Sequence, residues 1–440
     1  MNLSSFLVLS ATCLAAVGCS AADNGQDFTH NEAGSAGSGG TANGGSGGLG
    51  GSEAGSGGSM GGAAGHDDTA GSGGSAGAPT PKSVGIVVID VQRTFVTHAA
   101  TPDMPGIIDR TKAALQLAEA KNLPTFITFE DSKQGDHALD AALQPVVPDH
   151  AQDFIKTTFA ATGLPSFADA VTKSGLTHLV VMGAETDVCV LQTVLGLRKM
   201  GFTVLLQKDA VFTSEPHTSP AVRRMQQAGT LLVDQAAVAA YVAKPEDLPA
   251  APNAVVRIVE PLHMGVVLNS FTNASVGGNA DPLKTQKSAR LRELLMVSEW
   301  FSLPVYVADV GAGLPSAFAQ YYQGQLRPMS QIAQDSSVTQ LVFAGADGAV
   351  AGSMSTWLQS KDVFVMEDAL LAEGSADAQK TLLQPLFDQG LVPTTYKSFY
   401  YDMTKSVDLS QWPSQSWLDN FDKYYNMTQA PEDLPPMPPD

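Results

Sequence analysis

The chain has 440 residues, of which 44% are hydrophobic and 16% charged, and its formal net charge at pH 7 is −19. A chain this acidic is a poor partner for nucleic acid or for an anionic lipid surface, because both are negatively charged. No hydrophobic stretch reaches the length of about 20 residues that a membrane helix needs.

Residues 1–19 are predicted to be an export signal. Residues 6–17 are apolar but too short to span a bilayer, which is typical of the core of a signal peptide. Residues 16–19 (AVGC) resemble a bacterial lipobox, which implies cleavage before Cys19 and lipidation of its thiol, although Ala16 stands where Leu is commoner and no Lys or Arg precedes the apolar core. The alternative is secretion after cleavage near residues 20–22. We expect an exported protein, either held in the cell envelope (outer membrane or periplasm) by this lipid anchor alone or secreted.

Residues 20–80 are predicted to be a flexible linker. They consist largely of Gly, Ser and Ala, and such a tract cannot bury apolar surface. A coil of about 60 residues has a root-mean-square reach of roughly 40 Å. Because no strand precedes its glycine runs, they do not predict a phosphate-binding loop. We interpret the segment as a spacer that holds a globular body away from a membrane.

Residues 81–250 are predicted to form a first α/β domain. An apolar stripe between Ile107 and Ala118 predicts a helix, and residues 190–197 predict a buried helix. Strands that alternate with helices indicate a parallel sheet covered by helices on both faces. The strands are expected at residues 84–90, 123–130, 178–182, 201–210 and 230–234.

Residues 251–405 repeat the landmarks of the first domain in the same order. Strands are expected at residues 264–269, 303–309 and 362–369, and residues 341–351 match the strand and turn that lead to Cys189. Even a pentapeptide, PEDLP, occurs at residues 245–249 and again at residues 431–435. We interpret this pattern as a tandem duplication. Residues 406–440 form a tail outside the repeat.

The two copies differ where chemistry is expected. Asp90 is aligned with Asn269, and Cys189 with Ala351. The interval from Pro124 to Gly183, which contains Lys156, is 18 residues longer than the interval from Pro304 to Gly345. The second copy is therefore predicted to lack an acid, a cation and a thiol. We expect an inactive partner domain that packs on the first copy as an intrachain pseudo-dimer, and formation of a homo-oligomer stays open.

Cys189 is the main candidate for chemistry. Cys13 and Cys19 lie in the export segment, so Cys189 has no intrachain disulfide partner in the folded part. It lies at a strand-to-helix turn where Thr186 can cap the helix, and the partial positive charge of the helix start favours a thiolate. The alternative is an inert core residue, because free cysteines are often buried.

Asp90 and Lys156 complete a candidate catalytic set. An Asp at the end of a parallel strand is well placed to accept the thiol proton, and a nearby Lys stabilises the thiolate. The expected reaction is attack of Cys189 on an amide-like carbonyl, release of an amine or ammonia protonated by Asp90, and hydrolysis of the thioester. Backbone N–H groups of residues 183–189 are candidates for holding the oxyanion. Taken singly, a strand-end cap and a surface lysine are the alternatives.

The first copy resembles the isochorismatase-like cysteine hydrolases over about residues 83–240. The segments that carry the resemblance are residues 88–95 (VIDVQRTF), 153–159 (DFIKTTF) and 183–190 (GAETDVCV). The resemblance implies a three-layer α/β/α domain with a mostly parallel sheet of about six strands, and the duplication implies two such domains in tandem. It also implies a catalytic triad of Asp90, Lys156 and Cys189.

The resemblance adds supporting residues around this triad. It implies a cis peptide bond between Ala184 and Glu185, and the turn residues Ala184, Glu185 and Thr186 are expected to bind or support the substrate. Gln92 and Phe95 match positions that line the pocket or support it.

Two departures narrow the expected activity. Nicotinamidases of this family carry metal ligands in a segment resembling Asp-Trp-His-x-x-x-His, whereas residues 129–137 (FEDSKQGDH) lack the Trp-His pair. A surface loop is favoured over a metal site formed by Asp131 and His137, so we expect no metal and no other cofactor. Isochorismatases proper cleave a vinyl ether and need no cysteine. Cys189 therefore favours hydrolysis of a C–N bond by an amidase-type enzyme.

The sequence thus favours a cysteine hydrolase that acts on a small molecule, with no nucleic-acid partner. Two alternatives stay open. One is a non-catalytic binding or scaffold protein of the envelope. The other is a redox-responsive thiol protein, because a reactive cysteine outside the cytoplasm is oxidisable.

Overall fold

The structure, a computed structural model, describes residues 81–131, 136–215, 218–269, 282–316, 318–371 and 376–405. The predicted export signal, linker and C-terminal tail lie outside the described residues. No helix in the described part of the chain is both long enough and apolar enough to cross a membrane.

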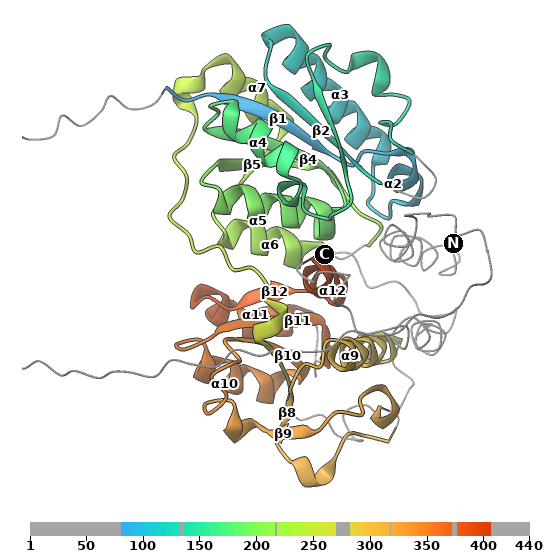
Figure 1. The fold of residues 1–440 in the computed structure, drawn as a ribbon, viewed down its shortest axis with the longest axis vertical. Helices are drawn as coiled ribbons and strands as arrows, with labels where there is room; N and C mark the ends of the chain where they lie inside the picture. Colours follow the sequence, from blue (N-terminus) through green and yellow to red (C-terminus); the bar gives the residue numbers. More distant parts are fainter. Residues whose placement is uncertain are drawn as a thin grey trace, which may run out of the picture. The chain divides into compact units, whose positions relative to one another are not determined.

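Two six-stranded parallel sheets organise the chain (Figure 1). Their strand orders are β3-β2-β1-β4-β5-β6 and β9-β8-β7-β10-β11-β12, so corresponding strands occupy corresponding places. The strands of the first sheet are β1 (Val84–Ile89), β2 (Thr125–Glu130), β3 (Gln152–Lys156), β4 (His178–Ala184), β5 (Thr203–Phe212) and β6 (Leu231–Val233). Those of the second are β7 (Met264–Asn269), β8 (Val305–Val307), β9 (Leu326–Pro328), β10 (Gln340–Ala346), β11 (Asp362–Leu371) and β12 (Val392–Thr394).

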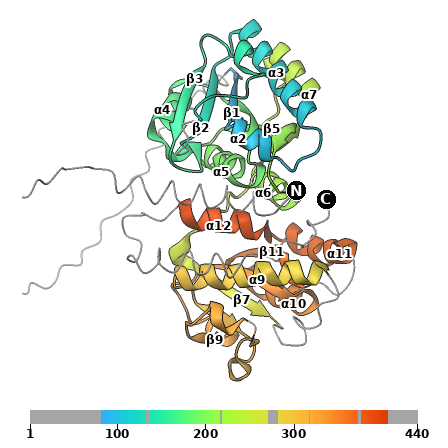
Figure 2. The same ribbon diagram turned by 90° about the vertical axis from the view of Figure 1, so that its right-hand side faces the viewer.

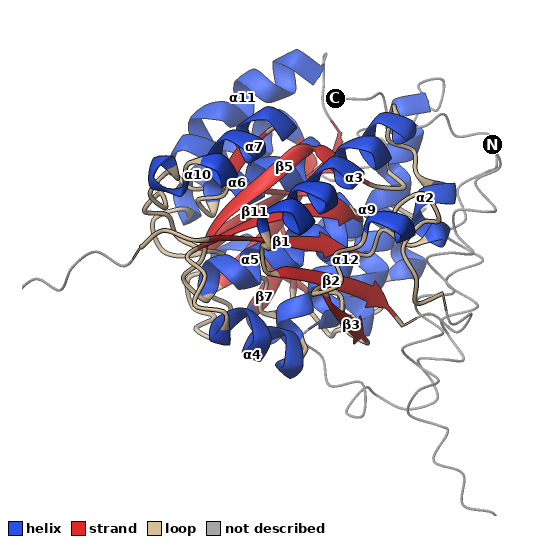
Figure 3. Cartoon of the chain, turned by 90° about the horizontal axis from the view of Figure 1, so that it is seen from above, coloured by secondary structure: helices blue, strands red, loops and turns tan. Residues whose placement is uncertain are grey.

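Helices cover both faces of each sheet (Figures 2 and 3). On the first sheet, one face packs against α2 (Arg93–His98), α3 (Met104–Lys121) and α7 (Gln235–Ala243), and the other against α4 (Pro165–Lys173), α5 (Leu191–Lys199) and α6 (Ser219–Gln227). On the second sheet, one face packs against α10 (Asp347–Trp357) and α11 (Ala376–Asp388), and the other against α9 (Pro282–Trp300) and α12 (Tyr396–Lys405). Two tandem α/β/α domains are therefore confirmed.

A single apolar core joins the two repeats. It contains Val194 and Met225 from the α4–α6 face of the first repeat and Leu294 and Phe399 from the α9–α12 face of the second. A buried ion pair between Arg224 and Asp402 crosses the same boundary. The described residues between 81 and 405 belong to one compact unit.

The edge strands β3 and β9 are not among the strands predicted from apolar runs. In β3 only Phe154 and Lys156 are buried, because the strand lies at the sheet edge and alternates between exposed and covered positions. The residues of β9 are only partly buried. Neither strand contains the continuous apolar run that identifies a central parallel strand.

The strand register corrects one alignment between the copies. Gly183 pairs with Ile89, and Gly345 pairs with Asn269. Asn269 is therefore the counterpart of Ile89, and the position that corresponds to Asp90 is 270, a serine outside the described residues. Both glycines have positive φ angles, 117° and 113°. A Cβ atom would lie 2.0 Å from the Ile89 oxygen or 2.3 Å from the Asn269 oxygen, so both repeats require glycine at this point.

The shorter interval in the second repeat lacks a helix rather than the strand that carries Lys156. Strand β9 is the counterpart of β3, and counting along the register places Gln331 at the level of Lys156. Between β9 and β10, where every residue is described, there is a 3₁₀ turn (Met329–Gln331) but no counterpart of α4. The lysine has thus been replaced, and the missing residues fall mainly on α4.

Candidate active site

The candidate catalytic residues meet at the carboxyl edge of the first sheet. Asp90 directly follows β1, Glu130 and Lys156 end β2 and β3, and Cys189 lies in the turn after β4. Parallel strands end at a common edge, where α/β proteins place their ligands. Asp90 and Lys156 are 0% exposed and Cys189 is 1% exposed, so all three candidate catalytic side chains are buried.

The Lys156 ammonium lies at the centre of this cluster. Its Nζ is 2.6 Å from Asp90 Oδ2, 3.9 Å from Glu130 Oε2 and 3.5 Å from Cys189 Sγ. The Cys189 thiol donates to Glu130 Oε2 at 3.5 Å. The structure therefore brings the three predicted residues together and adds a fourth, Glu130, that sequence reasoning missed. The sequence pattern that indicates Asp90 also indicates Glu130, because Glu130 ends an apolar strand just as Asp90 follows one.

Backbone and side-chain contacts fix the Asp90 carboxylate. Asp90 has a φ angle of 48°, which non-glycine residues rarely adopt. Its N–H donates to the Thr128 carbonyl oxygen at 3.1 Å, and its Oδ1 accepts a hydrogen bond from the Thr128 hydroxyl at 2.7 Å. One carboxylate oxygen is thus held by β2 and the other faces Lys156.

The nucleophile turn (residues 183–190) begins at Gly183 and carries Cys189. The peptide bond between Ala184 and Glu185 is cis, as the resemblance implies. The helix starts as a π-helical turn (Thr186–Val190) and continues as α5. Glu185 is the N-cap residue, so the expectation that Thr186 caps the helix was wrong, although Cys189 does lie in its first turn.

The turn residues expected to support the substrate are mostly enclosed by protein. Ala184 and Thr186 are buried. The Glu185 carboxylate accepts a hydrogen bond from the Ser214 N–H at 3.1 Å. The Glu185 carbonyl accepts from the N–H groups of Val188 and Val190 at 3.0 and 3.1 Å. These contacts hold the shape of the turn.

Burial sets the protonation of the site. It raises the pKa of the Cys189 thiol well above its ordinary range; Lys156 acts in the opposite direction, and Asp90 and Glu130 reinforce the rise. For Lys156, burial alone would lower the pKa, but Asp90, Cys189 and Glu130 outweigh it and raise the pKa above its ordinary value. The free site therefore holds an ammonium and a neutral thiol. Burial therefore opposes the thiolate that the helix start is expected to favour.

This protonation predicts a pH dependence for alkylation. Cys189 should react slowly with iodoacetamide near pH 7, because only the thiolate reacts and its pKa is raised. The rate should still be rising at pH 9, where an ordinary cysteine is mostly ionised. The measurement is the second-order rate of label at Cys189, followed by peptide mass spectrometry across the pH range. A rate that levels off near pH 7 would contradict the neutral thiol.

The Gln92 side chain forms hydrogen bonds with the backbone of Glu130, the last residue of β2. Its Nε2 donates to the Glu130 carbonyl oxygen at 3.1 Å and also to the Asp136 carbonyl oxygen, while its Oε1 accepts from the Glu130 N–H at 2.8 Å. Gln92 therefore positions Glu130. Phe95 lies in α2 and packs in the core of the first repeat.

The residues present do not fit a metal ion. In the described part of the chain, one group of three potential ligands has its ligand atoms within 4.8 Å of one another, namely Asp90, Glu130 and Cys189. The Lys156 ammonium lies against all three, and a second cation there would be repelled. Asp131 and His137 pair with each other at 2.8 Å on the exposed surface and belong to no such group.

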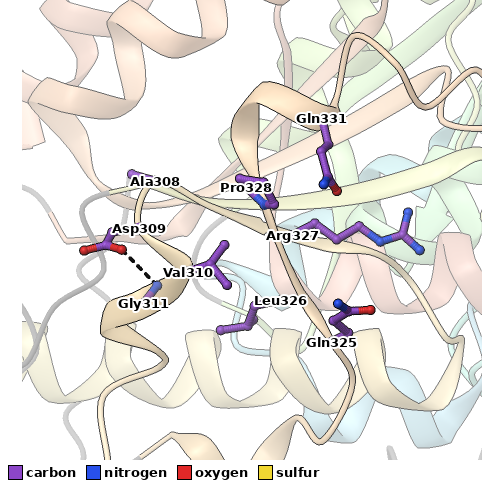
Figure 4. Close-up of a pocket in the computed structure, with 9 residues that line it drawn as sticks. All are labelled: Ala308, Asp309, Val310, Gly311, Gln325, Leu326, Arg327, Pro328 and Gln331. Atoms are coloured by element: carbon purple, nitrogen blue, oxygen red, sulfur yellow. Dashed lines mark hydrogen bonds between the residues drawn. The ribbon is translucent and has the colours of Figure 1, made fainter.

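In the second repeat, a cavity of about 660 Å³ is lined by residues 308–311, which follow β8, and by β9 with residues next to it (Figure 4). Asp309, Arg327 and Gln331 are among its lining residues. The Arg327 guanidinium pairs with Asp335 at 2.6 Å, outside the cavity lining. No lysine or cysteine is among the residues that line this cavity.

The first repeat is similar in sequence to known proteins. Residues 84–237 match the family model described as "Isochorismatase domain". Streptothricin hydrolase of Streptomyces noursei is 30% identical over 149 residues, which is 31% of this chain and 52% of the relative. The secreted isochorismatase effector Isc1 of Phytophthora sojae is 28% identical over 160 residues, 36% of this chain and 75% of the relative. The chain thus spans about half the length of the first of these relatives.

Solved structures show similar local matches. YcaC from Pseudomonas aeruginosa, with hexane-2,5-diol and covalent acrylamide, is 25% identical over 36% of this chain and 78% of that chain, with a TM-score of 0.33. N-carbamoylsarcosine amidase from Thermoplasma acidophilum is 13% identical over 35% of this chain and 96% of that chain, with a TM-score of 0.31.

Proposed function

We propose, because residues 84–237 match the family model described as "Isochorismatase domain", that Cys189 cleaves an amide-type C–N bond of a small molecule through a thioester intermediate. One observation carries the proposal. A buried thiol lies 3.5 Å from an ammonium and 3.5 Å from a carboxylate, at the edge of a parallel sheet. These groups supply a nucleophile, a proton acceptor and a fixed positive charge.

The first half of the reaction forms the thioester. The Cys189 thiol gives its proton to a carboxylate, Asp90 or Glu130, as the sulfur attacks the carbonyl carbon of the substrate. A C–S bond forms and the carbonyl oxygen becomes an oxyanion. When the oxyanion collapses, the C–N bond breaks and the nitrogen takes the proton from the carboxylate. An amine or ammonia leaves, and the acyl group stays on Cys189.

The second half regenerates the thiol. Water attacks the thioester carbonyl and loses a proton to the same carboxylate, the C–S bond breaks, and the sulfur recovers the proton. Lys156 stays positively charged throughout and stabilises the sulfur when it is anionic. Because the free Cys189 thiol is neutral, its proton moves to the carboxylate as the sulfur attacks the bound substrate.

Burial of Cys189 weakens the redox alternative. Sensor thiols are exposed and have a lowered pKa, whereas Cys189 is buried and its pKa is raised. A binding or scaffold protein remains the alternative to a hydrolase.

The test is a panel of small primary and secondary amides incubated with the full chain. Streptothricin belongs in the panel, because a relative is named as its hydrolase. We expect release of ammonia or amine, and an acyl group on Cys189 in the intact-mass spectrum after rapid acid quench. If no panel member is hydrolysed and none acylates Cys189, the scaffold alternative is favoured.

We also propose that the chain is exported and held at a membrane by lipid on Cys19. The support is the lipobox-like residues 16–19, followed by a Gly-rich tract. Mass spectrometry of the mature N-terminus tests this. An acylated Cys19 at the first position is expected, whereas a terminus at residues 20–22 without lipid would refute the anchor.

A further inference from the structure

Helix α12 of the second repeat lies against the nucleophile turn. Two perpendicular views place α12 between the two sheets (Figures 1 and 2). The Lys397 ammonium is 2.8 Å from Glu185 Oε2 and 3.6 Å from Asp187 Oδ1. It also donates to Ser214 Oγ at 2.9 Å and to Thr213 Oγ1 at 3.4 Å. One lysine of the second repeat thus contacts four side chains of the first.

Ser398 reaches the backbone of the same turn. Its hydroxyl donates to the Asp187 carbonyl oxygen at 2.8 Å, and both residues are buried. Asp187 Oδ1 is held in addition by the Thr213 hydroxyl at 2.6 Å. Since Asp187 precedes Cys189 by two residues in one helical turn, a contact that fixes Asp187 also fixes the sulfur.

Helix α12 contacts the other side of the site as well. The Tyr401 ring packs edge-on against the Phe159 ring, with centroids 4.7 Å apart and an interplanar angle of 74°. Phe159 follows β3, the strand that ends at Lys156. The helix therefore touches both the segment after the ammonium and the turn that carries the thiol.

The charges at this contact depend on each other. Burial opposes ionisation of Glu185, but the charge and hydrogen bond of Lys397 outweigh it, and the pKa of Glu185 is lowered. Burial raises the pKa of Asp187, and Lys397 limits that rise. Without Lys397, two buried acids would stand side by side with no opposite charge in contact from α12.

The two repeats are not equivalent at this point. The register of β6 and β12 makes Ala236 and Ala237 the counterparts of Lys397 and Ser398. The register of β4 and β10 makes Ala349 the counterpart of Asp187. The lysine and serine occur only on the repeat without a triad, and Asp187 only on the repeat with one.

We infer that Lys397 and Ser398 are positioning residues for Cys189, so that the second repeat is required for catalysis by the first. The part of this inference that is tested by hydrolysis rests on the proposed function. The placement of the thiol is a separate property and can be measured without turnover.

The experiment compares Lys397→Met with Arg223→Met in the full chain. Arg223 pairs with Glu367 across the same boundary, and its printed polar partners, Glu367 and Ser219, lie outside the nucleophile turn, so its variant controls for a weakened interface. In Lys397→Met we expect kcat to fall about 10- to 100-fold with KM changed less than about threefold, because a misplaced nucleophile slows chemistry more than binding. Alkylation of Cys189 should become at least about threefold faster, because the loosened turn admits reagent. Lys397→Arg should restore much of kcat.

Ser398→Ala is the second variant. It still tests the inference if Lys397→Met does not fold. It removes one hydrogen bond and no charge, and we expect kcat about three- to tenfold lower. Unchanged kcat and unchanged Cys189 alkylation in both variants would overturn the inference, as would equal changes in Arg223→Met. If the wild-type chain hydrolyses no amide, the proposed function fails, and the alkylation rates alone still decide whether α12 places the thiol.

Discussion

Replacing Cys189 with alanine should lower amide hydrolysis by a factor of about 10⁴ or more, to the limit of detection. The substitution removes the atom that forms the thioester, so the groups that remain cannot carry the two-step reaction. A factor of 10⁴ corresponds to about 5.5 kcal/mol of transition-state stabilisation. The measurement is the rate of ammonia or amine release at saturating substrate, together with loss of the acyl adduct in the mass spectrum.

Val194→Ala is the matched control for this variant. Val194 is 0% exposed and lies in the same helix, but its side chain has no group that can act as a nucleophile, an acid or a base. It should keep its activity within a few fold while losing some stability. Substantial activity in Cys189→Ala, at the level of this control, would exclude the thioester mechanism and leave the acids of the site to be examined as direct bases for water.

The sequence was sufficient for the parts of the site that lie at strand ends. Asp90 and Cys189 follow apolar runs. Lys156 is indicated by the comparison of the two copies and by the family resemblance, because the alternating burial of β3 leaves no apolar run. Glu130 meets the same strand-end criterion as Asp90, because it ends the apolar run of residues 123–130. The central strands were predictable because a strand buried on both faces has a continuous apolar run.

Other properties depend on packing between distant segments. Lys397 is 212 positions from Glu185, and no local pattern connects them. The raised pKa of the Cys189 thiol also depends on packing, because burial in the core around the turn is its largest cause. A sequence can show which residue types end the strands, while their protonation is decided by what covers them.

The second large effect is expected on stability. Replacing Lys156 with methionine should lower the free energy of unfolding by about 3–5 kcal/mol, because it leaves a buried charge without its partner. Asp90 is 0% exposed, and its Oδ2, 2.6 Å from the Lys156 Nζ, has no well-directed hydrogen bond from any other group in the described structure. The measurement is chemical unfolding of wild type and variant at neutral pH. Because the pKa of Lys156 is raised on folding, its contribution is complete below its ordinary value of 10.5 and declines only as pH rises toward the folded value.

A second substitution separates the ion pair from general packing. In the Lys156→Met background, Asp90→Asn removes the unpaired charge and should recover most of the lost stability, giving a large coupling between the two positions. Lys173→Met is the control, because Lys173 pairs with Asp169 at 2.9 Å on the surface, where a lost ion pair has little effect. Additive losses at positions 90 and 156 would mean that the two side chains do not compensate each other's charge. The double variant should nevertheless be inactive, since stability would be regained without the ammonium that the proposed reaction needs beside the sulfur.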